Sequence, residues 1–276
     1  MTVKKQEERS PYDLVGVIPA AGTARRLGPL PCSKELLPVG FHDKANEGRC
    51  RPKVVSHYLL ERMRLANMSK VYIILRAGKW DIPAYFGDGE MLNLHIAYLI
   101  MNFSFGVPYT LDQAYPFIKD STVVFGFPDI LFQPQDAFVQ LLAKQAESNA
   151  DVVLGLFIAD QPRKMDMVEL DNDGRVRGIQ IKPSRTRLRY AWIIAVWTSA
   201  FTHFMHEYVL SPSRRDIKDK TGKIVPEQKE LYVGNVIQAA LENNMKVEST
   251  LFSKGSYMDI GTPEDLIHAV RVKAND

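Results

Sequence analysis

Short apolar runs alternate with helical patterns along the first half of the chain. Such runs are typical of strands buried on both faces, whereas apolar residues three or four positions apart are typical of helices packed on a sheet. The predicted strands are 14–20, 71–75, 91–100 and 122–125. The predicted helices are 53–68 and, as a shorter element, 111–117. Strands that alternate with helices favour a mostly parallel sheet.

The second half adds further elements of both kinds and a hairpin signal. Strands are predicted at 151–158 and 190–197, and helices at 134–148, 198–209, 231–243 and 262–273. The sequence Asp171-Asn172-Asp173-Gly174 separates two alternating runs, as a hairpin turn does. The predicted fold class is therefore α/β in three layers, with a mostly parallel, mixed central sheet and helices on both faces.

Two polar stretches lie outside this pattern. We expect 1–11 to be a loose tail and 211–230 a long loop. No stretch resembles an interdomain linker, so we expect a single domain over residues 1–276. Trp192 and Trp197 lie on one predicted strand at a spacing that puts them on opposite faces, so we expect both to pack in the core but in different environments.

The composition excludes several classes of partner. Of 276 residues, 46% are hydrophobic and 24% are charged, and the formal net charge is +3. This balance gives no reason to expect a nucleic acid or a membrane surface as a partner. No run approaches the roughly 18 apolar residues of a membrane span, and no signal-type segment follows the polar start. We expect a cytoplasmic protein with reduced Cys32 and Cys50, and its oligomeric state is left open.

The loop after the first predicted strand carries the first candidate chemistry. Small residues follow that strand in the order Ala20, Ala21, Gly22, Thr23, Ala24. Small side chains let backbone N–H groups approach a phosphate closely. Arg26 can bind phosphate oxygens through two N–H groups, and Lys34 adds a second positive charge. Because both common phosphate-loop patterns are missing, the small residues on their own are more typical of an ordinary turn.

Several short segments along the chain change that interpretation. They are Arg26-Leu27-Gly28-Pro29, Ser33-Lys34-Glu35-Leu36-Leu37-Pro38, Arg51-Pro52-Lys53-Val54-Val55, Tyr85-Phe86-Gly87-Asp88-Gly89, Ile181-Lys182-Pro183 and Met258-Asp259-Ile260-Gly261-Thr262-Pro263-Glu264. In this order they resemble the signature of the sugar-1-phosphate nucleotidyltransferases, which have a Rossmann-like fold. The resemblance extends along nearly the whole chain, and the last segment, similar to D-I-G-T-P-E, is the most specific.

The resemblance implies that the chain joins a nucleoside triphosphate to a sugar-1-phosphate and releases pyrophosphate, with Mg²⁺ as the cofactor. It favours dTTP or UTP with glucose-1-phosphate as substrates. Asp129 and Asp259 are the implied Mg²⁺ ligands. Arg26 would hold the leaving pyrophosphate, Lys34 the α-phosphate and Lys182 the sugar phosphate. The implied nucleotide-binding residues are Ala20, Ala21, Gly22, Thr23, Ala24, Gly106, Thr110 and Gln113.

The chain also departs from the family pattern. Ala24 and Arg25 replace a Gly-Thr pair, and the span from Arg26 to Lys34 is shorter than in thymidylyltransferases. The stretch 41–50 resembles an insertion, and Ile181 replaces the glutamate of E-K-P. A shorter span also occurs in cytidylyltransferases of related fold. One alternative is therefore a cytidylyltransferase acting on another phosphorylated alcohol or sugar, and a second is a non-catalytic regulatory protein that binds a nucleotide sugar.

Overall fold

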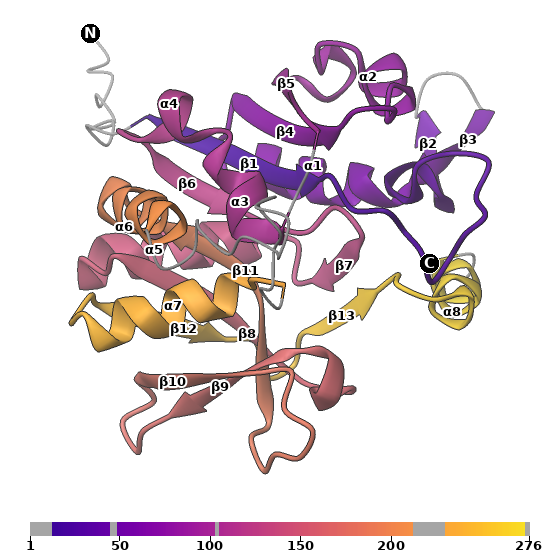
Figure 1. Cartoon of the computed structure of the whole chain (residues 1–276). Coiled ribbons are helices and arrows are strands. Elements are labelled where there is room, and N and C mark those ends of the chain that lie inside the picture. The colour runs from indigo at the N-terminus through magenta and orange to yellow at the C-terminus, as the bar shows by residue number, and fades with distance from the viewer. Residues whose placement is uncertain (1–12, 45–48, 103–104, 212–229, 274–276) are drawn as a thin grey trace, which may run out of the picture.

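The first part of the central sheet is parallel. The computed structural model describes residues 13–44, 49–102, 105–211 and 230–273. Four strands lie side by side and run in one direction (Figure 1): β6 (Thr122–Phe125), β1 (Leu14–Ala20), β4 (Lys70–Arg76) and β5 (His95–Met101). Each contains a predicted run, although β5 begins later than predicted because Glu90–Leu92 forms a 3-10 turn.

The second part of the sheet is antiparallel except for one parallel pair, β8 with β12, and it forks at β11 (Tyr190–Trp197). On one edge, β11 pairs with β8 (Val152–Ile158), which pairs in turn with β12 (Val247–Leu251). On the other edge, β6 pairs with the end of β11, and β9 (Asp166–Leu170) pairs with its start. β9 and β10 (Val176–Ile181) form the predicted hairpin. Neither β6 nor β9 pairs with Trp192–Ile194, so the two strands diverge there.

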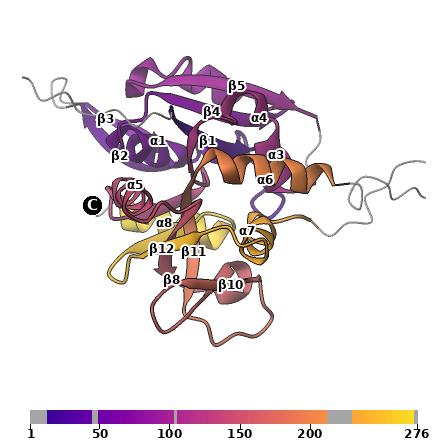
Figure 2. The same cartoon turned by 90° about the vertical axis from the view of Figure 1, so that its left-hand side faces the viewer.

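Helices cover both faces of the sheet (Figure 2). Each face has its own apolar core. One core includes residues of α1 (Val55–Leu65) and α5 (Ala137–Ser148). The opposite core includes residues of four helices, α3 (Val107–Asp112), α4 (Tyr115–Ile118), α6 (Ser199–Leu210) and α7 (Val233–Glu242). The predicted three-layer α/β fold with a mixed sheet is therefore confirmed.

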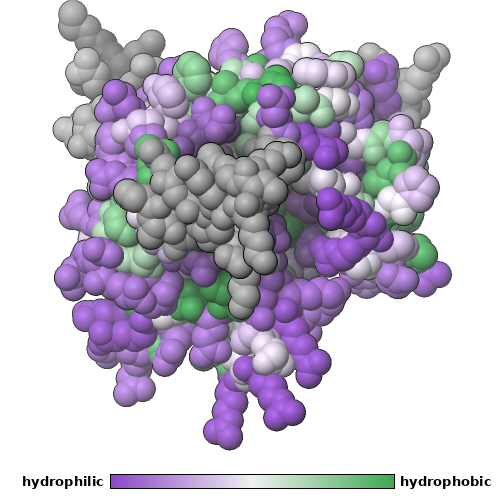
Figure 3. Space-filling model, in the orientation of Figure 1, coloured by the Kyte–Doolittle hydropathy of each residue, from purple (hydrophilic) through white to green (hydrophobic). Residues whose placement is uncertain are grey.

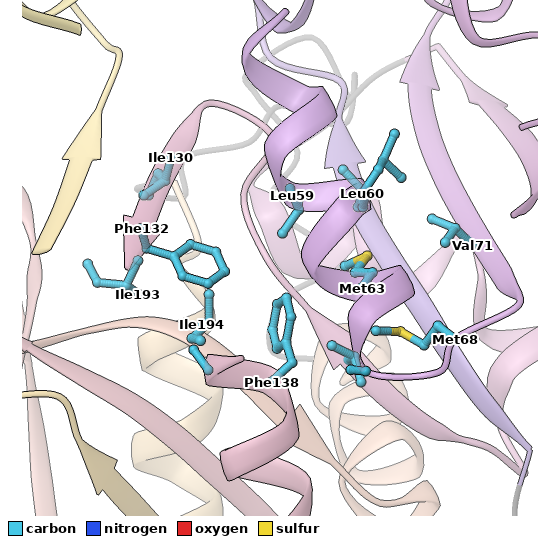
Figure 4. Close-up of a cluster of buried hydrophobic side chains, with 14 of the residues drawn as sticks. Leu59, Leu60, Met63, Met68, Val71, Ile130, Phe132, Phe138, Ile193 and Ile194 are labelled. Atoms are coloured by element: carbon cyan, nitrogen blue, oxygen red, sulfur yellow. The ribbon is translucent and has the colours of Figure 1, made fainter. Parts of the chain in front are cut away.

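Strand residues alternate between the two cores. On β1, Val15 and Val17 face the core of α3 and α6, whereas Ile18 and Ala20 face the core of α1 and α5. Figure 4 shows part of the latter core, where side chains of α1 meet Phe138 of α5. Because both faces of β1 are apolar, its exit at Ala20 is fixed from both sides.

Trp192 and Trp197 share one environment, which contradicts the expectation of different ones. The register of β11 against β8 shifts between Trp192 and Ile194, so the strand holds an extra residue there. A bulge of this kind changes which face the following residues occupy. Both indoles lie in the core of α3 and α6, with ring centroids 6.0 and 5.4 Å from that of Phe125. Core packing of both residues is confirmed.

Two short ladders beside the central sheet are not predicted by the sequence pattern. β2 (Pro38–Lys44) and β3 (Arg49–Val54) form a hairpin, which includes the described part of the stretch interpreted as an insertion. Because β3 continues to Val54, the helix predicted over 53–68 occupies only Val55–Leu65. The second ladder joins β7 (Ile130–Gln133) to β13 (Ser256–Asp259). Four-residue strands are too short to show an alternation of their own.

The remaining elements complete the surface. The helix predicted over 111–117 is divided into α3 and α4. α2 (Asp81–Phe86) follows β4, and α8 (Pro263–Lys273) packs against β2. Hydrophilic residues line the lower edge of the molecule in Figure 3, where Figure 1 places the β9–β10 hairpin. No helix among the described residues is long and apolar enough to cross a membrane. The predicted tail 1–11 and residues 212–229 of the predicted loop lie outside the described residues.

The core of α1 and α5 provides a test of the layer assignment. Phe138 is 0% exposed, whereas its neighbour on α5, Val139, is 44% exposed. We expect Phe138→Ala to lower the free energy of unfolding by about 3–5 kcal/mol, because it leaves a cavity between two packed helices. Val139→Ala should change it by less than about 0.5 kcal/mol. Urea unfolding followed by circular dichroism measures both, and equal effects would contradict the assignment.

Candidate active site

The loop that leaves β1 closes into a turn around Ala24. The N–H groups of Leu27 and Gly28 both donate to the carbonyl oxygen of Ala24, at 3.0 Å. Ala24 has a φ of 51°, in the left-handed region that residues with a Cβ rarely adopt. Glycine adopts this region without strain. Ala24 therefore preserves the backbone shape of a glycine turn, although it replaces a glycine of the family pattern.

Lys34 follows this turn and forms an ion pair with Asp129. Its Nζ donates to Oδ2 of Asp129, which lies between β6 and β7. Burial by itself would lower the pKa of Lys34, but the charges of Asp129, Glu35 and Asp259 raise it above the ordinary value. Lys34 is therefore a lasting positive charge at the edge where the parallel strands end.

The β7–β13 ladder brings Asp129 and Asp259 together. Asp259 is the last residue of β13, and the N–H of Ile260 donates to the carbonyl oxygen of Asp129 at 2.9 Å. Burial and the charge of Asp129 raise the pKa of Asp259 to about 6, against the opposing charges of Lys34 and Arg26. The charge of Asp129 thus disfavours ionisation of Asp259, and a cation beside the two carboxylates would relieve that repulsion.

Arg26 lies against the same pair of carboxylates. A Cβ built on Gly261 would lie 3.1 Å from Nη2 of Arg26 and 3.5 Å from Oδ1 of Asp259, so the guanidinium packs on the backbone beside Asp259.

Two carboxylates fit Mg²⁺, which proteins usually bind through one or two carboxylates plus phosphate oxygens and water. Within the described part of the chain, no group of three or more His, Cys, Asp and Glu side chains is arranged to hold a metal. Phosphate oxygens and water would supply the other ligands of a bound Mg²⁺.

The segment after β4 holds both neighbours of Lys34. The backbone N–H of Ser33 donates to Oδ2 of Asp81 at 2.6 Å, and its hydroxyl donates to Oδ1 at 2.7 Å. Glu35 is 1% exposed, and its carboxylate accepts two hydrogen bonds from Nζ of Lys79, at 2.7 and 2.8 Å. Burial raises the pKa of Glu35 and lowers that of Lys79, and each partner opposes the shift of the other. Lys34 is thus held between two anchored residues.

A cavity of about 630 Å³ opens beside Lys34 and Asp129. Predicted nucleotide-binding residues in its lining are Ala21, Gly22, Thr23, Gly106 and Thr110. The other three predicted nucleotide-binding residues, Ala20, Ala24 and Gln113, do not line it. The cavity therefore combines the loop after β1 with the start of α3.

Gly106 shapes one wall of this cavity. Its φ is 130°, and a Cβ there would lie 2.1 Å from the carbonyl oxygen of Leu231. Only glycine fits both conditions. The chain before α3 can consequently approach the chain before α7 closely enough for the N–H of Leu231 to donate to the carbonyl oxygen of Phe105 at 3.2 Å.

A second cavity, of about 180 Å³, meets the first at Asp129. The two share Val107, Phe127, Asp129 and Glu230. The smaller cavity lies where β6 and β9 diverge along β11, and Trp192 of the open edge lines it. The other predicted site residues in its lining are Arg26, Lys182 and Asp259. The divergence of the sheet thus creates a second compartment next to the carboxylate pair.

Lys182 follows β10 and lines this second cavity. Its φ is 40°, a left-handed conformation that is strained for a residue with a Cβ. Its Nζ lies 3.7 Å from the ring centroid of Tyr232, at the start of α7, within the range of a cation–π interaction. Strained backbone of this kind occurs often at functional sites.

Sequence reasoning missed several residues that surround these groups. They are Glu35, Lys79, Asp81, Asp166, Trp192 and Tyr232. Glu35 lies inside a signature-like segment, but nothing in the sequence indicates its burial. A wider cavity, of about 1090 Å³, lies beside α1 and contains none of the predicted site residues. Size alone therefore does not identify the site, whereas the convergence of Arg26, Lys34, Asp129 and Asp259 does.

Comparison with known proteins identifies the family of this chain. A family model described as nucleotidyl transferase matches residues 15–275. The chain therefore belongs to the nucleotidyl transferase family. A solved structure from Bacillus anthracis, described as a glucose-1-phosphate thymidylyltransferase, has a TM-score of 0.77 and 20% sequence identity to this chain. The match covers 95% of this chain and 96% of that one, which shows a shared fold.

Curated relatives carry the same description. A glucose-1-phosphate thymidylyltransferase of Streptomyces antibioticus is 26% identical, over 93% of this chain and 65% of the relative. That of Streptomyces griseus is 25% identical, over 92% of this chain and 64% of the relative. The chain thus spans slightly less than two thirds of the length of these relatives.

The buried ion pair beside Lys34 can be tested by removing one partner or both. We expect Lys79→Met to lower the free energy of unfolding by about 3 kcal/mol, because it leaves the Glu35 carboxylate buried without its partner. The double variant Glu35→Leu with Lys79→Met should recover most of the loss. Lys70→Met, which removes an exposed ion pair with Asp13, is the control and should leave the urea midpoint unchanged. A double variant as unstable as the single one would contradict this account.

Proposed function

We propose that the chain is a nucleotidyltransferase that joins a nucleoside triphosphate to a sugar-1-phosphate and releases pyrophosphate. The observation that carries the proposal is the meeting of two cavities at Asp129, with Arg26, Lys34, Lys182 and Asp259 around the junction. The larger cavity has the size and the backbone-lined wall for a nucleotide. The smaller one suits the acceptor, which in this arrangement approaches from the opposite side.

The reaction needs little more than positioning. An oxygen of the sugar phosphate attacks the α-phosphorus and forms a new P–O bond. The bond from the α-phosphorus to its bridging oxygen breaks, and pyrophosphate leaves with the electron pair. The second pKa of a phosphate monoester is about 6, so the attacking group is already ionised near neutral pH. No general base is required, and the barrier falls through alignment and charge stabilisation.

The cationic residues divide this work. Arg26 lines the smaller cavity beside Asp259, and it would reach across the junction to bind the leaving pyrophosphate, because its fork of N–H groups matches phosphate oxygens. Lys34 stabilises the charge that builds on the α-phosphate, and its raised pKa keeps it protonated. Lys182 directs the sugar phosphate in the smaller cavity. Asp129 and Asp259 would hold Mg²⁺, which supplies further neutralisation of phosphate charge.

The substrate proposal follows the relatives. Because they are described as glucose-1-phosphate thymidylyltransferases, we propose dTTP or UTP with glucose-1-phosphate. The test crosses the ribonucleoside triphosphates and dTTP with a set of sugar-1-phosphates, with and without Mg²⁺, and measures pyrophosphate release. We expect release with dTTP or UTP that EDTA abolishes and Mg²⁺ restores. Turnover with CTP and a different phosphorylated alcohol would support a cytidylyltransferase instead. If no acceptor gave pyrophosphate release with any triphosphate, the result would support a non-catalytic protein.

The carboxylate pair provides the sharpest single-residue test. We expect Asp129→Asn to lower kcat/KM at least about 100-fold, equivalent to about 2.7 kcal/mol of barrier. Loss of one negative charge weakens metal binding and also frees Lys34 from its ion pair. Asp120→Asn, at an exposed position before β6, is the matched control and should leave kcat/KM unchanged. Unchanged turnover of Asp129→Asn would exclude it as a metal ligand.

A further inference from the structure

Asp166 is a carboxylate in the smaller cavity to which no role has so far been assigned. It is the first residue of β9, and its partner in the ladder, Ile181, is the last residue of β10. The backbone N–H of Lys182 is thus the first one beyond the ladder. Without a strand partner, this N–H needs an acceptor from elsewhere.

The carboxylate of Asp166 supplies that acceptor and also reaches the start of α7. Burial raises the pKa of Asp166 to about 6, while the charge of Lys182 and the backbone N–H groups of Gly234 and Lys182 oppose the rise. Gly234 lies in the first turn of α7, where N–H groups have no partner within the helix. The side chain of Asp166 therefore binds two segments that are far apart in the sequence, the end of β10 and the start of α7.

Gly234 makes this contact sterically feasible. A Cβ at position 234 would lie 2.5 Å from Oδ2 of Asp166. Such a distance is too short for any real contact, so an alanine would push the carboxylate away. Glycine is otherwise unfavourable within a helix, which gives its presence here a packing reason.

The two segments that Asp166 joins carry the two residues of the cation–π contact. Lys182 extends from the end of β10 in its strained conformation, and Tyr232 lies directly before α7. Both line the smaller cavity together with Asp129 and Asp259. Fixing the backbone of Lys182 and the first turn of α7 therefore fixes the place of the Lys182 ammonium.

We propose that Asp166 is a positioning residue, which holds Lys182 and Tyr232 so that the Lys182 ammonium faces the phosphate of the acceptor. This inference rests on the proposed function for the identity of the acceptor. The indole N–H of Trp192, in the lining of the same cavity, is a further group that lowers the pKa of Asp166.

Kinetics of four variants separate positioning from a purely structural role. We expect Asp166→Ala to raise KM for the sugar-1-phosphate at least about tenfold, with KM for the nucleoside triphosphate within about twofold of the original. Asp166→Asn retains an acceptor oxygen and should recover part of the loss. Gly234→Ala should reproduce the effect while leaving the charge in place. Glu169→Gln, exposed on the same strand, is the control and should change neither constant.

Two further results would overturn the proposal. Equal changes in both KM values, or a loss of activity that follows the folded fraction in thermal unfolding, would indicate a structural role only. In addition, Asp166→Ala combined with Lys182→Met should be no worse than Lys182→Met alone, since Asp166 acts through Lys182. Independent, multiplicative losses would contradict that dependence.

A crystal structure of Asp166→Ala keeps this inference separate from the proposed function. We expect Lys182 to leave its left-handed conformation and its Nζ to leave the ring of Tyr232. If both features persist, Asp166 does not position Lys182, whatever the activity of the chain. If the original protein releases no pyrophosphate with any acceptor, the proposed function fails, while the structural comparison still decides the positioning role.

Discussion

The ion pair between Lys34 and Asp129 is the contact on which the rest of the site depends. It joins the loop after β1 to the chain after β6, and these neighbouring parallel strands end at the same edge of the sheet. Both side chains are largely shielded from water, and such an ion pair is favourable only when its geometry is good, so the backbone on either side must be fixed. Lys79 and Asp81 provide this support by binding the two neighbours of Lys34 along the chain. The loop is therefore held before any ligand arrives.

The fork of the sheet explains why a second compartment exists beside that contact. If β9 continued alongside β6, side chains and backbone would fill the space in front of Trp192. Instead, β6 and β9 use different parts of one edge of β11, and the bulge between Trp192 and Ile194 lies at the gap. Behind the gap, the ring of Phe125 packs against that of Trp192. The bulge in β11 thus explains two features. It puts Trp192 and Trp197 in one core, against the simple alternation of strand residues, and it lies where the smaller cavity forms.

The sequence predicted the parts of the molecule that depend on local pattern. The buried strands at 14–20 and 122–125 have their predicted bounds, because a strand covered on both faces is apolar throughout. What it could not predict depends on contacts between distant segments. Asp129 and Asp259 are neighbours only through the β7–β13 ladder, and neither four-residue strand has a recognisable pattern. The resemblance to the family signature identified both residues as candidate Mg²⁺ ligands, and the ladder explains how they come to lie together.

Ile181 shows how a departure from the family pattern can be understood only in three dimensions. In the sequence, Ile181 stands where the family pattern has a glutamate, so the negative charge before Lys182 is missing. Across the ladder, its partner is Asp166, and a Cβ on Gly234 would lie 2.5 Å from Oδ2 of Asp166 and 2.7 Å from Cδ1 of Ile181. The two side chains therefore share one side of the ladder. A glutamate at 181 would bring a second carboxylate to a buried group whose pKa is already raised to about 6. An apolar residue at 181 lets one carboxylate remain beside Lys182, supplied by the neighbouring strand, so the missing glutamate does not count against binding of an acceptor.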